Sequence, residues 1–267
     1  TAGPGLVGAL TVGLSAAKAL AVALQVPLYG VNHIVAHLAV DELANGPFPP
    51  HFIGLVVSGG HTNLFEVRDI ARDVTELGHT LDDAAGEAFD KVGRLLDLPY
   101  PGGPHIDRLA REGDPNAIPF PRGLSRGREL ARHPYNFSFS GVKTAVARHI
   151  EELTDAGRPL PRADIAASFS EAVVDVLVTK SLAACRAVGA TTLVIGGGFS
   201  ANSRLRELIA EQGARDGIEV RIPPLRYCTD NGAMIAALGS AVSRGSVAPS
   251  ALDIGAESAM DLEQVVA

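Results

Sequence analysis

The chain has 267 residues, 46% of them hydrophobic, and a formal net charge of −7. This length suits one large domain or two small ones, and the acidic balance argues against a protein that coats nucleic acid by bulk charge. Only Cys185 and Cys228 are present, far apart and outside any C-x-x-C pair, which is typical of a reducing compartment. We therefore expect a cytoplasmic protein without a disulfide scaffold or a thiolate metal site.

The first long apolar run extends from Leu6 to Leu24. It is long enough for a membrane span, but two glycines, a serine and Lys18 interrupt it. We predict a buried helix that packs closely on a sheet, and no membrane partner. The chain starts at Thr1 rather than Met, and a Gly-Pro-Gly turn leads directly into this run, which predicts a fragment or a processed product.

Two histidines, His33 and His37, lie four residues apart directly after Asn32. In a helix these positions share one face, with Cβ atoms about 5–6 Å apart, so both imidazoles could bind one metal ion. Asn32 is a good N-cap, and the preceding Pro27–Val31 is expected to form a short buried strand. The same spacing also arises by chance on half-buried helices, so a metal site needs a third donor from elsewhere.

The apolar segment Phe52–Val57 predicts a central strand that ends in the turn Ser58–Gly60, with a second strand from Asn63 to Val67. Backbone N–H groups at such a tip can bind phosphate, although most turns of this kind are only turns. A helix is expected from Asp82 to about Leu96, and acidic residues in its first turn would suit the helix dipole.

The most basic window of this acidic chain extends from Arg122 to Arg132. It is either a solvated loop or a loop that contacts the phosphates of a polyanion. The alternation of Phe and Ser at Phe137–Ser140 then predicts a half-buried strand before a glycine turn into a helix.

A long amphipathic helix is expected over Asp164–Val188, followed by a strand over Thr191–Ile195 and the turn Gly196–Gly198. Glycines in such a turn let the backbone approach a nucleotide closely. Asp230 opens the final helix, where it is either an N-cap or the third ligand that the histidine pair lacks. Two histidines and one carboxylate leave open positions, a pattern associated with Fe(II) and Zn(II).

Taken in order, these segments resemble the TsaD family, the tRNA N6-adenosine threonylcarbamoyltransferases once described as glycoproteases. The matching stretches cover nearly the whole chain: Thr1–Leu6, Asn32–His37, Val57–Thr62, Asp82–Lys91, Tyr100–Pro104, Asn136–Thr144, Gly196–Gly198 with Asn202, and Cys228–Asn231. The resemblance implies an α/β fold with two lobes, as in actin, hexokinase and the Hsp70 ATPase, and a nucleotide in the cleft between the lobes.

The resemblance also implies site residues. One divalent ion per subunit, Fe2+ first and Zn2+ second, would be bound by His33, His37 and Asp230. The positions expected to hold the adenylate are Val56, Val57, Ser58, Gly59, Gly60, Asp90, Gly103, Asp107 and Asn202.

The implied division of the chain is residues 1–50 for the remainder of the first lobe, 51–230 for the second lobe, and 231–267 for a helix that returns to the first lobe. The family opens with a strand hairpin that bears an Ile-Glu-Thr-Ser-Cys-Asp-type motif, and this segment is absent here. We therefore expect a first lobe without its leading strands, with apolar faces uncovered, and a polypeptide that is inactive as it stands.

The reaction implied by the resemblance moves a threonylcarbamoyl group from threonylcarbamoyl-AMP to the exocyclic amine of the adenosine that follows the anticodon, in tRNAs that read codons starting with A. Protein partners of the TsaB and TsaE type are expected. Alternatives are a carbamoyltransferase acting on a small-molecule hydroxyl and a non-catalytic docking piece. A sugar or acetate kinase has no use for the histidine pair, and a metallopeptidase would need a Glu where Ile34 stands.

Overall fold

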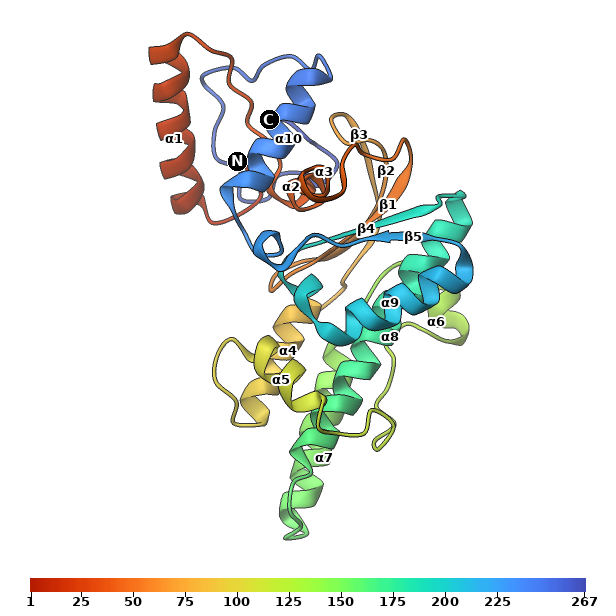
Figure 1. Cartoon of the computed structure of the whole chain (residues 1–267). Helices are drawn as coiled ribbons and strands as arrows, with labels where there is room; N and C mark the ends of the chain where they lie inside the picture. Colours follow the sequence, from red (N-terminus) through yellow and green to blue (C-terminus); the bar gives the residue numbers. More distant parts are fainter.

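A five-stranded mixed sheet organises the protein, whose residues 1–267 are all described by a computed structural model (Figure 1). The strand order is β3-β2-β1-β4-β5. The strands are β1 Phe52–Val57, β2 Thr62–Asp69, β3 Asp73–His79, β4 Thr192–Gly196 and β5 Glu219–Arg221. Because β1 pairs antiparallel with β2 and parallel with β4, the turns that follow β1 and β4 lie at the same edge of the sheet.

The chain also forms ten α-helices. They are α1 Val7–Leu24, α2 His33–Ala39, α3 Asp41–Asn45, α4 Ala85–Leu95, α5 Gly102–Ala110, α6 Gly127–Arg132, α7 Ser140–Asp155, α8 Arg162–Val188, α9 Ser203–Asp216 and α10 Gly232–Arg244. Two short 3-10 helices, η1 Gly198–Ala201 and η2 Leu225–Tyr227, follow β4 and β5.

Strand β1 is buried on both faces, which explains its unbroken apolar sequence. Side chains alternate between the faces of a strand, so Ile53, Leu55 and Val57 join the larger core with α4, α8 and α9. Phe52 and Val56 join the smaller core with α2 and α10. The sheet therefore separates two hydrophobic cores and connects the helices on its two sides.

Helix α2 approaches the sheet at two glycines. A Cβ on Gly54 would lie 2.4 Å from the Leu38 side chain, and a Cβ on Gly196 would lie 2.4 Å from the carbonyl oxygen of His37. The absence of these two side chains lets α2 lie against β1 and β4. His37 is thereby held beside the end of β4.

The two ends of the chain meet on the α2 side of the sheet. Val31 forms an isolated bridge with Val266, and the Asn32 side chain donates hydrogen bonds to the carbonyl oxygens of Asp261 and Gln264. Helix α10 packs against α2 here. The expected division at residues 50 and 230 stays a prediction.

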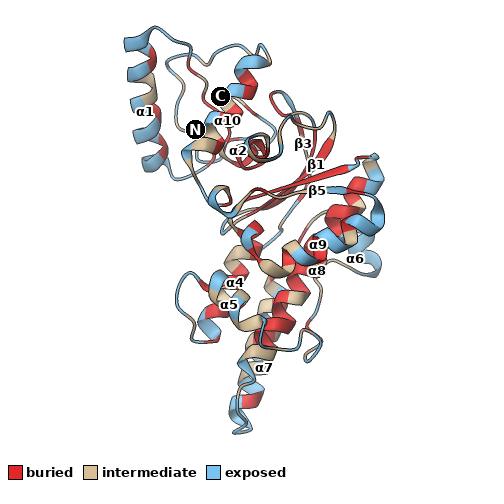
Figure 2. Ribbon diagram, in the orientation of Figure 1, coloured by how far each residue is buried: buried red, intermediate tan, exposed pale blue.

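Helix α1 departs from the prediction. It lies apart from the sheet (Figure 1), and only Leu10, Leu14 and Ala21 are buried, so the expectation of a buried helix packed on the sheet is wrong (Figure 2). Its exposed large apolar side chains are Val7, Val12, Leu20, Val22 and Leu24. A sequence that is apolar around the whole helix specifies no single buried face. By length and composition alone, α1 could cross a membrane.

Two predicted strands are also wrong. Pro27–Val31 forms only one isolated bridge, between Val31 and Val266. At Phe137–Ser140 only one bridge forms, between Thr80 and Phe137, and α7 begins at Ser140. Phe137 and Phe139 are both buried with their rings stacked 6.1 Å apart, so their alternation with serine does not mark two faces of a strand.

The helix expected from Asp82 begins only at Ala85. The Asp82 carboxylate instead accepts hydrogen bonds at the start of α7, from the backbone N–H groups of Phe139 and Ser140 and from the hydroxyls of Ser138 and Ser140. This acidic residue therefore caps a helix that is distant in the sequence.

Candidate functional site

Three possible metal donors converge from the two ends of the chain. His33 and His37 come from α2, and Asp230 comes from the segment before α10. The Asp230 Oδ1 lies 3.3 Å from Nε2 of His37 and 3.6 Å from Nε2 of His33. The predicted third donor is therefore brought to the histidine pair.

Local capping positions each of these side chains. The Asn32 side chain accepts hydrogen bonds from the backbone N–H groups of Ile34 and Val35, so α2 begins at His33 as the sequence predicts. Helix α10 is capped by Asn231, which accepts from the N–H of Met234. The alternative that Asp230 is the N-cap is wrong, and its carboxylate stays free to face the histidines.

The donor set fits a divalent ion in spacing and in charge. Bonds of about 2.0–2.1 Å in tetrahedral geometry place neighbouring ligand atoms roughly 3.4 Å apart. The two separations from Asp230 are close to this value, and all three ligand atoms lie within 4.8 Å of one another. Burial, and then the nearby His37, lower the pKa of His33, so its imidazole is neutral at pH 7. The hydrogen bond with His37, together with the proximity of His33, lowers the pKa of Asp230, which is therefore ionised at pH 7.

The buried ring of His37 has a polar partner at only one of its two nitrogen atoms. His37 is 2% exposed, and its Nδ1 has no hydrogen-bond partner. Buried polar atoms without partners are costly. The only polar contact of this ring is therefore on the Nε2 side, which faces Asp230.

A cavity of about 790 Å3 opens over the cluster. His33 and Asp230 line it, and so does the tip Ser58–Gly60 between β1 and β2. At this tip the Ser58 hydroxyl accepts hydrogen bonds from the backbone N–H groups of Gly60 and His61. A phosphate at the tip would therefore compete with the Ser58 side chain for these donors.

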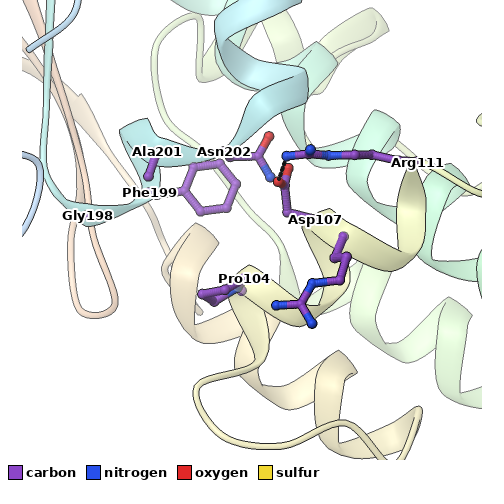
Figure 3. A pocket seen from close by; sticks show the side chains of 9 residues that line it. Pro104, Asp107, Arg111, Gly198, Phe199, Ala201 and Asn202 are labelled. Atoms are coloured by element: carbon purple, nitrogen blue, oxygen red, sulfur yellow. Dashed lines mark hydrogen bonds and ion pairs between the residues drawn. The ribbon is translucent and has the colours of Figure 1, made fainter. Parts of the chain in front are cut away.

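A second cavity, of about 300 Å3, lies between α5 and the start of α9 (Figure 3). Its lining is Gly103, Pro104, Asp107, Arg108, Arg111, Gly198, Phe199, Ala201 and Asn202. Figure 3 shows Asp107 and Asn202 close together beside the ring of Phe199. Gly198 lines both cavities, so they lie on two sides of the glycine turn after β4.

The expected adenylate positions Gly103, Asp107 and Asn202 meet in this smaller cavity. The Asp107 carboxylate accepts hydrogen bonds from the backbone N–H and hydroxyl of Ser203 and pairs with Arg111. Asn202 caps α9 by accepting from the N–H of Leu205. Both side chains therefore have structural partners as well as a place in the cavity wall.

The other expected positions lie behind these walls. The Asp90 carboxylate accepts a hydrogen bond of 2.7 Å from the N–H of Gly102, which positions the start of α5. Val56 and Val57 are buried within β1, in different cores. The structure brings none of these three into either cavity, and their part in binding stays a prediction.

Several lining residues were not identified from the sequence, and two of them are polar residues beside the metal-type cluster. His61 and Thr229 both line the larger cavity, and burial, followed by the charge of His37, lowers the pKa of His61. In the sequence, only their positions next to predicted site residues could have identified them. His61 follows the Ser-Gly-Gly turn, and Thr229 precedes Asp230.

Comparison with known proteins identifies similar sequences over nearly the whole chain. A family model described as "TsaD: tRNA N6-adenosine threonylcarbamoyltransferase" matches residues 1–237. A protein of that name from Bifidobacterium adolescentis is 54% identical over 265 residues, which cover 99% of this chain and 76% of the relative. A protein of the same name from Corynebacterium diphtheriae is 54% identical over 264 residues, or 98% of this chain and 75% of the relative.

Solved structures of HypF share the fold. The structure of T. kodakarensis HypF matches with a TM-score of 0.65 and 17% identity, covering 86% of this chain and 39% of HypF. A full-length HypF structure matches with a TM-score of 0.62 and 13% identity, covering 80% and 43% of the two chains. The chain spans less than half of these HypF proteins, and the likeness confirms the α/β fold class of the actin and Hsp70 type.

Proposed function

We propose a function for this chain from the fact that it belongs to the TsaD family of tRNA N6-adenosine threonylcarbamoyltransferases. In this proposal its two cavities hold the two parts of threonylcarbamoyl-AMP. The chain is accordingly a transferase that acts in tRNA modification. The observation that supports this proposal is the meeting of His33, His37 and Asp230 at a cavity that His33 and Asp230 line and that shares Gly198 with a second cavity.

The smaller cavity is proposed to take the adenosine of the donor. Its volume of about 300 Å3 is at the lower end of the range for small-molecule sites. Phe199 and Pro104 offer apolar surface to the base, and Asp107 and Asn202 offer oxygen atoms to ribose hydroxyls. The glycine turn at Gly198 lets the backbone approach the phosphate closely.

The larger cavity is proposed to take the threonylcarbamoyl group. A divalent ion, Fe2+ first and Zn2+ second, would supply Lewis-acid polarisation and a fixed point for an oxygen-bearing group here. His33, His37 and Asp230 would hold that ion because burial keeps the His33 imidazole neutral at pH 7 and the Asp230 carboxylate is ionised. The tip Ser58–Gly60 and Gly198 would orient the carbamoyl carbon by fixing the groups on either side of it.

The tRNA phosphates are proposed to contact α6 and the segment before it. Arg126, Arg128 and Arg132 are exposed and form no ion pair or side-chain hydrogen bond, whereas Arg122 pairs with Asp175 at 3.1 Å. Unpaired arginines on a surface are suited to nucleic-acid phosphates. The local positive charge compensates for a net charge that is unfavourable for RNA binding.

The family resemblance supports three further parts of the proposal. These are threonylcarbamoyl-AMP as the donor, protein partners of the TsaB and TsaE type, and a cytoplasmic location. The relatives are tRNA-modifying enzymes, which supports a soluble protein, although α1 is apolar enough to span a membrane. The competing functions are small-molecule O-carbamoyl transfer and non-catalytic docking.

A single assay separates these functions. The protein is incubated with threonylcarbamoyl-AMP and tRNA, and AMP release and modified adenosine are both measured. The proposal predicts both products for the full-length protein that carries the family's opening hairpin, and their loss when His33 and His37 are replaced by Ala in it. AMP release that requires a small alcohol instead of tRNA would indicate O-carbamoyl transfer. Metal and AMP binding without either product would indicate docking.

A further inference from the structure

Arg206, near the start of α9, uses its charged side chain on the backbone. Its Nε donates a hydrogen bond of 2.7 Å to the carbonyl oxygen of Ser200. Its Nη2 donates to the carbonyl oxygen of Pro223 at 2.9 Å and to the Sγ of Cys228 at 3.4 Å. The side chain is half-buried, and none of these partners is a carboxylate.

The three acceptors belong to two segments that border the two proposed sites. Ser200 lies in η1, which begins at Gly198, the residue that lines both cavities. Pro223 opens the segment that leads from β5 to α10, and Cys228 lies in it two residues before Asp230. One guanidinium therefore connects the glycine turn after β4 with the segment that carries the carboxylate of the cluster.

The sheet itself does not hold these two segments together. The ladder between β4 and β5 ends at the pair of Val194 and Arg221, before either segment begins. Beyond it, a Cβ on Gly198 would lie 3.9 Å from Cγ2 of Thr229, which is an ordinary van der Waals distance, and no backbone hydrogen bond joins the two segments directly. Arg206 supplies hydrogen bonds where those of the sheet have ended.

We infer that Arg206 is a positioning residue for both sites, because it sets the place of the Gly198–Ala201 turn relative to Asp230. This inference rests on the function proposed above, which assigns adenosine to the smaller cavity and a divalent ion to the cluster. A guanidinium suits this role because its planar fork fixes the directions of its donors. Loss of groups that orient a metal ligand without touching the ion typically weakens metal binding by about 10–100-fold.

The charge of Arg206 alone predicts a different result from its positioning role. A nearby cation repels a divalent ion, so removing only the charge should leave Zn2+ binding unchanged or make it tighter. Adenosine has no charge, so its affinity does not depend on the charge of Arg206. Weaker binding of both probes therefore reports a change in position.

Three variants separate these effects. Arg206→Met removes the donors and the charge, whereas Arg206→Lys keeps the charge and replaces the planar fork by a single ammonium group. Arg215→Met is the matched control, because Arg215 lies on the same helix, is exposed, pairs with Glu211 and lines neither cavity.

Isothermal titration of the full-length protein with Zn2+ alone and with adenosine alone measures the two affinities. We expect Arg206→Met to bind Zn2+ about tenfold or more weakly and adenosine about threefold or more weakly. Arg206→Lys should be intermediate at both sites, and Arg215→Met should equal the wild type. Thermal unfolding checks that each variant is folded, and Arg206→Lys provides the test if Arg206→Met does not fold.

Unchanged or tighter Zn2+ binding in folded Arg206→Met, or a loss of affinity for only one probe, would overturn the inference. If only Arg206→Lys folds, wild-type affinities in that variant would overturn it as well. Weaker binding of both probes in a protein that transfers nothing would support the inference and contradict the proposed function. Transfer by a wild type whose Arg206→Met variant keeps both affinities would do the reverse. A wild type that binds neither probe would overturn both.

Discussion

Asn32 connects three backbone segments through one side chain. It accepts two N–H groups at the start of α2 and donates to the carbonyl oxygens of Asp261 and Gln264. We expect Asn32→Ala to lower the free energy of unfolding by about 2–3 kcal/mol, because a cap is lost and two carbonyls lose their donor. Chemical denaturation measures this change.

Asn32→Ser is the matched control for this prediction. It keeps a side-chain oxygen that can cap α2 and removes the amide donor without adding a charge, so its loss of stability should lie between those of the wild type and Asn32→Ala. Equal stability of all three proteins would show that the cap does not position α2.

Lys180 is 1% exposed and faces carbonyl oxygens rather than a carboxylate. Its Nζ donates to the carbonyl oxygens of His133 and Pro134, and burial lowers its pKa to about 8. The pKa of Lys180 is lower in the folded protein than in the unfolded chain. Burial of this lysine therefore destabilises the fold at any pH at which the lysine of the unfolded chain is charged. We expect the free energy of unfolding to rise between about pH 8 and pH 10 by roughly 1–3 kcal/mol.

The Lys180→Met variant tests the origin of this rise. Methionine has a similar length and no charge, so the rise in stability above pH 8 should disappear in denaturation curves. A rise of the same size in the variant would assign the pH dependence to other groups.

At the scale of single elements, the approach of α2 to β4 depends on Gly196. A Cβ there would lie 2.4 Å from the carbonyl oxygen of His37, which is backbone and cannot rotate away. We expect Gly196→Ala to displace α2, lower stability by about 1–3 kcal/mol, and weaken metal binding by about tenfold or more. Isothermal titration and thermal unfolding measure the two effects.

The control for this prediction is Gly239→Ala in α10, where a Cβ meets no atom within 4 Å. Alanine should be neutral or slightly stabilising there because it is the better helix former. Normal metal affinity in Gly196→Ala would show that α2 reaches its position independently of this contact.

The elements that could be predicted from the sequence are those whose signals are local. The apolar run at Phe52–Val57, the amphipathic pattern of α8 and the cap at Asn32 each specify their own segment. Asp82 was misassigned because its partners lie at the start of α7, more than 50 residues away. Helix α1 was misassigned because its apolar residues mark no single face.

At the scale of the whole molecule, the sequence could predict which residues form the candidate site. It could not predict how these residues are arranged in space. The histidine spacing predicts that His33 and His37 share a face, and the structure places Asp230 beside them. No spacing could show that Asp107 also connects α5 to the start of α9, or that Asn202 also caps α9. Nor could it show that α1 provides a wall of the cavity, because that wall depends on tertiary packing.

The affinity of the site for metal should depend on pH through its histidine ligands. Only neutral imidazoles bind metal, and the pKa of His33 lies below its usual value of 6.5. We therefore expect affinity to be constant from pH 8 to about pH 6.5 and to fall at more acidic pH. Equilibrium dialysis at fixed free metal measures the curve, and a fall that begins above pH 7 would contradict the assignment of His33.

The most direct test measures bound Fe2+ and Zn2+ by elemental analysis in the purified protein and in three variants. The wild type and His79→Ala, which removes an exposed histidine far from the cluster in sequence, should each bind one ion per chain. Asp230→Ala should bind at least about tenfold more weakly, and His33→Ala combined with His37→Ala should bind none. One tightly bound ion per chain in the double histidine variant would contradict the account.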